Sequence, residues 1–132
     1  MMQTEFIQVG EIQLEKISEG EKTAVYIHTN EPVITDTQSA LDLMATVRYE
    51  VDCDIFLLDK ANIKEEFFDL STRLAGEIAQ KYVNYGVKLV IIGDFSAYTS
   101  KSLHDFIYEC NNGKDLFFVS GREEALERVF PA

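Results

Sequence analysis

Apolar and polar residues alternate along this chain in blocks that predict strands and helices in turn. Short apolar stretches have the length and composition of strands. Two of them, 54–59 and 87–94, are nearly continuous apolar runs closed by an aspartate, which is typical of strands buried on both faces. The polar segment 18–21 predicts a hairpin turn between the first two. The predicted strands are 12–14, 24–27, 54–59, 87–94 and 116–119.

Helices are predicted where apolar residues recur every three to four positions. The first is expected over about 36–51, and Thr35 and Gln38 form a capping box at its start. The second is expected over 70–85, and Gly86 ends it.

Two more helices complete the pattern. The third carries its apolar residues between 103 and 110 and stops at 111–113. The fourth follows a second capping box, made by Ser120 and Glu123, and continues to Phe130. A hairpin followed by alternating helices and strands predicts an α/β fold with a mainly parallel sheet and right-handed crossovers.

The length and charge of the chain narrow its class. With 132 residues, of which 46% are hydrophobic, we expect a single domain over 1–132 with a substantial core. The 23 acidic residues outnumber the 12 basic ones and give a formal charge of -11. Because such a charge repels nucleic-acid phosphates and anionic lipid, we expect neither nucleic-acid nor membrane binding, and a basic patch on a partner protein suits it.

Targeting signals, membrane spans and cysteine motifs bear on the cellular compartment. The first residues lack the basic and then apolar pattern of a secretory signal, and no apolar run is long enough to span a bilayer. Cys53 and Cys110 belong to no CxxC motif and make no disulfide framework. These features predict a cytoplasmic protein.

Polar residues gather where the predicted parallel strands end. His28, Asp59, Asp94 and Ser120 should line up on the edge where open α/β sheets bind ligands. The two aspartates either satisfy local loops or, with His28, hold a divalent cation. Ser96, after Asp94, either contacts an anion or belongs to an ordinary polar loop.

The start of the second predicted helix allows two interpretations. Asp69 or Ser71 can cap the helix, which stabilises it by roughly 1 kcal/mol. Alternatively Ser71 or Thr72 accepts a phosphate, which would gain from the helix dipole and from Arg73.

The order of elements over residues 22–130 resembles that of STAS domains, the anti-sigma-factor-antagonist type found also at the ends of sulfate transporters. The counterparts here are a strand ending in Asp59, the segment 69–72 opening a helix, Gly86 before a strand, and 124–126 in the last helix. In phosphorylated STAS proteins the switch serine directly follows the aspartate, whereas here Leu70 stands at that place.

A closer resemblance, spanning most of the chain, is to a bacterial family known only as domain of unknown function 4180. It is carried by the segments 67–72, 74–77, 83–85 and 92–96. Both resemblances imply a STAS-like α/β fold, and the family of unknown function brings no established activity. The resemblance to STAS domains implies a regulatory or protein-interaction module, for which phosphorylation near the start of the second helix is one candidate switch.

Two functional hypotheses from different classes follow. The first is a cytoplasmic, non-catalytic regulatory module with a protein partner, because no strong catalytic or cofactor-binding pattern is present; we expect no catalytic residue and no cofactor. The alternative is an enzyme or sensor that binds a small molecule or a metal at the strand-end edge, using Asp59, Asp94 and His28. Self-association through aromatic residues such as Phe67 and Phe68 is a third possibility.

Overall fold

Six strands form one sheet in which the order along the chain is also the order in space. The computed structural model describes residues 2–131. β1 to β3 pair antiparallel, and β3 to β6 pair parallel, so the predicted α/β fold with an N-terminal hairpin and a mainly parallel sheet is confirmed. The strands are β1 (Met2–Val9), β2 (Ile12–Glu19), β3 (Lys22–His28), β4 (Ile55–Asp59), β5 (Lys88–Ile92) and β6 (Leu116–Val119).

The antiparallel half contains a strand that the sequence pattern did not predict. β1 pairs with β2 over its whole length, and Gly10 with Glu11 forms the two-residue turn between them. Gly20 and Glu21 make the same kind of turn between β2 and β3, so the predicted turn at 18–21 is shorter than expected. Both glycines have a positive φ, as the first position of a type II′ hairpin turn requires.

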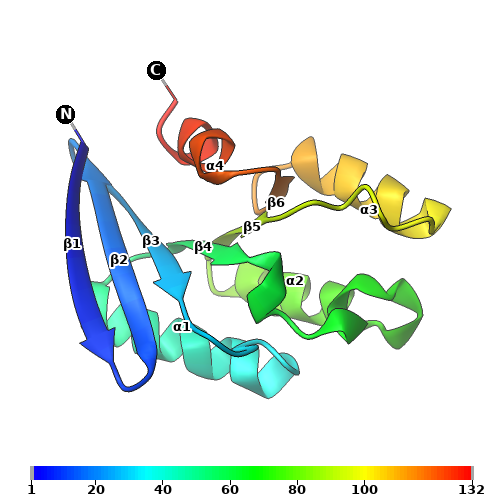
Figure 1. Cartoon of the computed structure of the whole chain (residues 1–132), viewed down its shortest axis with the longest axis horizontal. Helices are drawn as coiled ribbons and strands as arrows, with labels where there is room; N and C mark the ends of the chain where they lie inside the picture. The colour runs from blue at the N-terminus through cyan, green and yellow to red at the C-terminus, as the bar shows by residue number, and fades with distance from the viewer. Residues whose placement is uncertain (1, 132) are drawn as a thin grey trace.

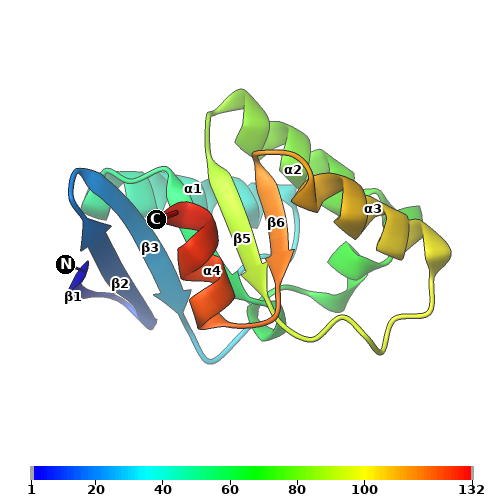
Figure 2. The same cartoon turned by 90° about the horizontal axis from the view of Figure 1, so that it is seen from above.

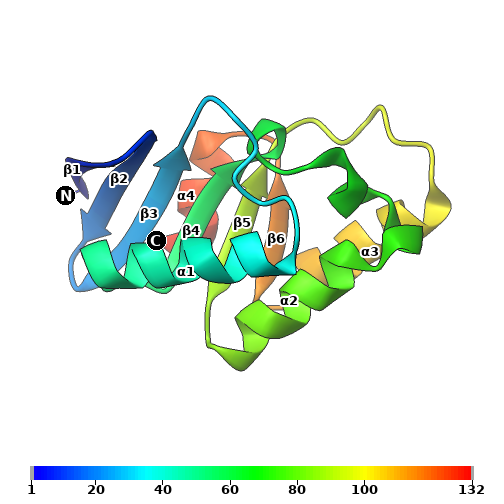
Figure 3. The same cartoon turned by 90° about the horizontal axis from the view of Figure 1, so that it is seen from below.

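Helices cover the two faces of the sheet unequally (Figures 1 and 3). One face packs against α1 (Thr37–Val51), α2 (Leu74–Asn84) and α3 (Lys101–Asn111), and its buried side chains include Phe56, Leu58 and Ile91. Figure 2 shows α4 (Arg122–Val129) across the opposite face. There Ala125 and Val129 pack on a smaller core. Among residues 2–131, no helix has the length and apolar character needed to cross a membrane.

Three short 3₁₀ turns, η1 (Lys60–Asn62), η2 (Glu65–Phe68) and η3 (Leu70–Thr72), connect β4 to α2. The predicted start of the second helix at residue 70 is therefore wrong. Arg73 has a left-handed backbone, with φ at 66°, and separates η3 from the helix. The apolar spacing that suggested one long helix runs through this break, because periodicity does not detect a single left-handed residue.

The first predicted capping box lies one residue too early. Asp36, rather than Thr35, caps α1: its carboxylate accepts a hydrogen bond from the backbone N–H of Ser39. The hydroxyl of Ser39 in turn accepts one from the N–H of Asp36, so Ser39 takes the place expected for Gln38.

The second predicted capping box also differs in its partners. Gly121 is the N-cap of α4 and supplies no side-chain hydrogen bond. Ser120 instead donates from its backbone N–H and its hydroxyl to the carboxylate of Glu124, one residue beyond the expected Glu123. The acids of the first turn still suit the positive end of the helix dipole.

Candidate functional site

The carboxyl ends of the parallel strands meet at one edge of the sheet, as the pattern predicted. Ile27 of β3 is level with Leu58 of β4, and Asp59 of β4 is level with Ile92 of β5. His28 and Asp59 are thus the last residues of neighbouring strands. Because strand side chains alternate, both share the sheet face that α4 covers.

A buried carboxylate lies on that face, beside His28. Glu15 of β2 is only 4% exposed. Arg122, the first residue of α4, donates hydrogen bonds from Nη1 to Oε1 at 2.9 Å and from Nη2 to Oε2. Nε2 of His28 lies 2.8 Å from Oε1 of Glu15. One carboxylate therefore joins β2, β3 and α4.

Glu15 and Arg122 stabilise each other's charged form. The hydrogen bond from Arg122 is the main cause that holds the pKa of Glu15 below its ordinary value, although burial acts in the opposite direction. The same hydrogen bond raises the pKa of Arg122. A bidentate hydrogen bond between a guanidinium group and a carboxylate is among the stronger hydrogen-bonded arrangements in proteins.

Tyr26 and Asp59 extend the arrangement to β4. The hydroxyl of Tyr26 donates a hydrogen bond to Oδ1 of Asp59. The rings of Tyr26 and His28 lie with centroids 4.3 Å apart, and the guanidinium carbon of Arg122 lies 5.6 Å from the tyrosine ring. Burial and the carboxylate of Asp59 both raise the pKa of Tyr26, so its hydroxyl stays a donor. We call Glu15, Tyr26, His28, Asp59 and Arg122 the polar cluster.

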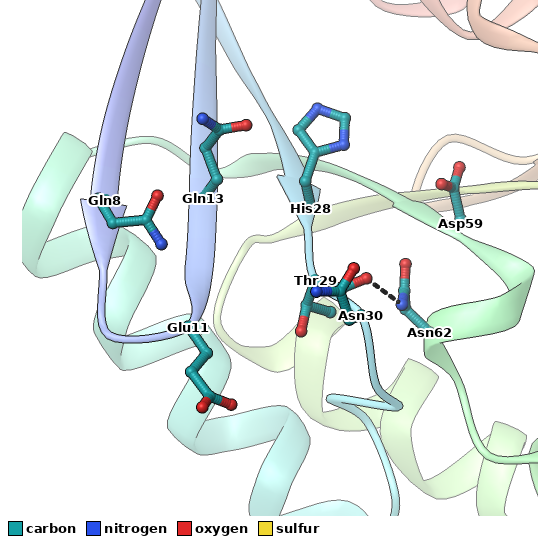
Figure 4. Close-up of a pocket in the computed structure, with 8 residues that line it drawn as sticks. All are labelled: Gln8, Glu11, Gln13, His28, Thr29, Asn30, Asp59 and Asn62. Carbon is teal, nitrogen blue, oxygen red and sulfur yellow. Dashed lines mark hydrogen bonds between the residues drawn. The ribbon is translucent and has the colours of Figure 1, made fainter.

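A pocket of about 430 Å³ opens beside the polar cluster (Figure 4). His28 and Asp59 belong to both, and Gln8 and Gln13 continue the wall across β1 and β2. Every lining side chain is polar, and among the described residues none of those lining it is a lysine or an arginine. The others are Glu11, Thr29, Asn30 and Asn62.

Asn62 fixes the loop on one side of the pocket. It is 7% exposed, and its Nδ2 donates to the backbone oxygens of Thr29 at 2.9 Å and Glu31 at 3.2 Å. The backbone carbonyl of Asn62 accepts a hydrogen bond from the backbone N–H of Val33 at 2.8 Å. The loop after β3 is therefore held by the turn after β4 without any ligand being needed.

Asp94 is separate from this pocket. Its Oδ1 accepts a hydrogen bond from the backbone N–H of Ser96 at 2.9 Å, and hydrogen bonding from Ser96 lowers its pKa. Neither residue lines the pocket. Across residues 2–131 no three His, Cys, Asp or Glu side chains are grouped so that they could hold a metal ion. His28, Asp59 and Asp94 are therefore not brought together as a cation site, which was one of the two alternatives that the sequence left open.

The segment 69–73, expected to start the second helix, is likewise separate from the pocket. Its acidic and hydroxyl side chains form hydrogen bonds with nearby residues of the same stretch of chain. Asp69 accepts hydrogen bonds from the N–H of Ser71 at 3.0 Å and from its hydroxyl at 2.7 Å, which lower the pKa of Asp69. The hydroxyl of Thr72 donates to the backbone oxygen of Glu66. Asp69 is thus a cap, but of η3 rather than of the helix, and Arg73 supplies no side-chain cap to α2.

The aromatic pair Phe67 and Phe68 lies in the core, at 1% and 4% exposure. They pack as core residues, so these two side chains offer no surface for self-association. Their rings pack edge to face with centroids 5.1 Å apart.

Three residues of the polar cluster were not predicted as functional. Glu15 and Arg122 are 107 positions apart, and nothing in their local patterns relates them. Tyr26 lies in an apolar run that predicted a strand and no functional role. The one available signal was an acid inside a strand, directly opposite a tyrosine in the antiparallel register.

A family model described as a domain of unknown function (DUF4180) matches residues 19–129. The match covers most of the chain, which therefore belongs to this family. No curated protein and no solved structure matches it. The matched region contains four residues of the polar cluster, and Glu15 precedes it.

Proposed function

We propose that this member of the family is a binding module for a small polar molecule, which it takes into the pocket at the carboxyl edge of β3 and β4. The observation that carries the proposal is the wholly polar lining of a pocket that borders the polar cluster. Crevices outside the carboxyl ends of parallel strands are the usual ligand sites of open α/β sheets.

The charges of the lining support a neutral hydroxylated ligand or a cationic one. Glu11 and Asp59 contribute carboxylates, and Gln8 and Gln13 contribute amides that both donate and accept. Arg122, the nearby cation of the polar cluster, is already paired with Glu15. The chain as a whole carries a charge of -11, which disfavours phosphorylated ligands.

Two side chains are suited to contact the ligand directly. Oδ1 of Asp59 accepts from Tyr26, which leaves Oδ2 as an acceptor for a ligand hydroxyl or ammonium group. Nε2 of His28 contacts Glu15, which leaves Nδ1 as the ring atom that faces a ligand. Both side chains are held in place by partners that do not line the pocket, so the site is organised before binding.

A regulatory role would use the same contacts. His28 and Arg122 share the carboxylate of Glu15, so a ligand that draws His28 away changes the hydrogen bonding at the start of α4. We therefore propose a cytoplasmic sensor whose output surface includes α4. Phosphorylation at Ser71 or Thr72 has less support, because α2 begins only at Leu74 and Asp69 lies 2.7 Å from the Ser71 hydroxyl.

Thermal unfolding tests the proposal, since a ligand that binds the native state raises the melting temperature. The panel comprises primary amines, polyols and monosaccharides, with phosphate and sulfate for comparison. At least one amine or polyol should stabilise the wild type and Asp94→Asn, whose acid follows the end of β5 but lies outside the pocket. It should stabilise Asp59→Asn and Gln13→Ala much less.

Two results would contradict the proposal. One is a panel in which no amine or polyol stabilises the wild type. The other is equal stabilisation of Asp59→Asn, Gln13→Ala and the wild type. Gln13 is exposed, so its substitution tests the pocket without disturbing the core.

A further inference from the structure

The first strand is a long edge with little protection against pairing. β1 ends the sheet, and it spans eight residues with a single charge, Glu5, and neither proline nor glycine. Natural proteins usually protect such edges with charges, prolines, bulges or very short strands. β6, at the opposite edge, has four residues and lies against α3. Figure 1 shows β1 on the outside of the sheet.

The hairpin determines which backbone groups of β1 point outward. Val9 and Ile12 flank a two-residue turn, so they form a hydrogen-bonded pair. Pairs then alternate, and every second residue back from Val9 bonds to β2. The N–H and C=O groups of Thr4, Phe6 and Gln8 therefore point away from the sheet.

We propose that β1 pairs antiparallel with β1 of a second copy of this chain, with Phe6 on the two-fold axis. The axis of such a dimer is perpendicular to the sheet, so residues that face each other must come from the same face. Two central registers meet this condition near the middle of the strand. One places Glu5 opposite Glu5, which opposes like charges, and the other places Phe6 opposite Phe6.

The second register is self-complementary along the strand. It places Glu5 opposite Ile7 and Thr4 opposite Gln8, so no two charges face each other. The two Phe6 rings, each 57% exposed in one chain, cover one another. Exchange between the outward groups adds about six backbone hydrogen bonds. Because β1 carries only one charge, charge complementarity favours neither a basic nor an acidic partner segment. A second copy of β1, by contrast, matches the strand residue by residue in this register.

This interface would border the proposed ligand pocket. Gln8 lines the pocket, and in this register Thr4 of the second copy lies directly opposite Gln8. The pairing itself requires no ligand, so it is measured on the free protein, and its failure would leave the ligand-binding proposal standing.

Sedimentation velocity tests the interface. The wild type should sediment at twice the chain mass of 15.0 kDa. Phe6→Glu, which places two carboxylates on the axis, should sediment as a single chain. Tyr49→Glu is the matched control, since Tyr49 is 87% exposed on α1 and should leave the dimer intact. A single-chain wild type, or a Phe6→Glu variant as dimeric as the control, overturns the proposal; far-ultraviolet circular dichroism confirms that each variant is folded.

Crosslinking tests the register. Phe6→Cys should form an intermolecular disulfide on oxidation, because only residue 6 faces itself at a distance that a disulfide spans. Gln8→Cys faces Thr4 and should not crosslink. The wild type measures any background from Cys53, which is buried, and Cys110, which is half-buried. Crosslinking of Gln8→Cys to the same extent as Phe6→Cys overturns the register.

Discussion

Arg122 at the start of α4 donates two hydrogen bonds to the buried carboxylate of Glu15 in β2, 107 positions earlier in the chain. The contact joins the last helix to the antiparallel half of the sheet. His28 shares the same carboxylate and also lines the pocket. The feature that orders the fold at this place therefore also orders the proposed binding site.

Arg122→Ala should lower the free energy of unfolding by about 2–3 kcal/mol, because it leaves the Glu15 carboxylate buried without its main partner. Arg122 is partly exposed, which keeps the loss below that of a fully buried pair. Urea unfolding measures the change. Lys101→Ala removes an exposed pair with Asp105 and should cost less than about 0.5 kcal/mol. Equal losses in the two variants would contradict this role of the Glu15 contact.

The stability provided by Glu15 should depend on pH. Its pKa in the folded protein lies below the ordinary value of 4.5. A carboxyl with a lowered folded pKa contributes stability above its unfolded pKa and loses it as the pH falls through the folded pKa. The difference in unfolding free energy between wild type and Glu15→Gln should thus be constant near neutral pH and shrink below 4.5. Urea unfolding midpoints of both proteins over a pH series measure this difference. A difference that grows on acidification would contradict the stabilising role of the ionised Glu15.

Arg73→Gly should raise the free energy of unfolding by about 0.5 kcal/mol. Arg73 adopts a left-handed conformation, with φ at 66°, which costs an ordinary residue roughly 1–2 kcal/mol and glycine almost nothing. The greater freedom of glycine in the unfolded chain offsets part of the gain. Arg73→Ala keeps the Cβ and should show no such gain. Thermal unfolding compares them, and a more stable alanine variant would rule out this explanation.

Ser71→Glu should leave ligand binding unchanged. The substitution places a carboxylate near Asp69, which we expect to cost about 0.5 kcal/mol of stability through like-charge repulsion. Ser71 does not line the pocket, so the ligand-induced rise in melting temperature should equal that of the wild type. A rise that disappears in Ser71→Glu would favour the phosphorylation switch instead.

The buried parallel strands were predictable because a continuous apolar run in a strand requires both faces of the sheet to be covered. Leu57 and Leu58 are adjacent and point to opposite faces, and both are fully buried. β1 was missed because its side chains are largely exposed, so burial does not impose an apolar alternation on it. Its pairing with β2 depends on the turn at Gly10 and on backbone hydrogen bonds, which side-chain patterns do not report.

The site was predictable only in part. His28 and Asp59 were found because strand ends in a parallel sheet meet at one edge. Asp94 was predicted to end a strand in the same way, but β5 stops at Ile92, and the carboxylate of Asp94 accepts a hydrogen bond from the N–H of Ser96 in the following loop. Glu15 was missed because an acid inside a strand is normally solvated, and only the three-dimensional fold brings Arg122 to it.

The most direct test of the binding proposal is a map of backbone amide shifts by nuclear magnetic resonance, recorded as a stabilising amine or polyol is added. The account predicts that the shifts concentrate at 28–30, 59–62 and the turn at Gly10 and Glu11, which surround the pocket. Amides over 69–73 should not move. Shifts centred on 69–73, with the pocket amides unchanged, would contradict it.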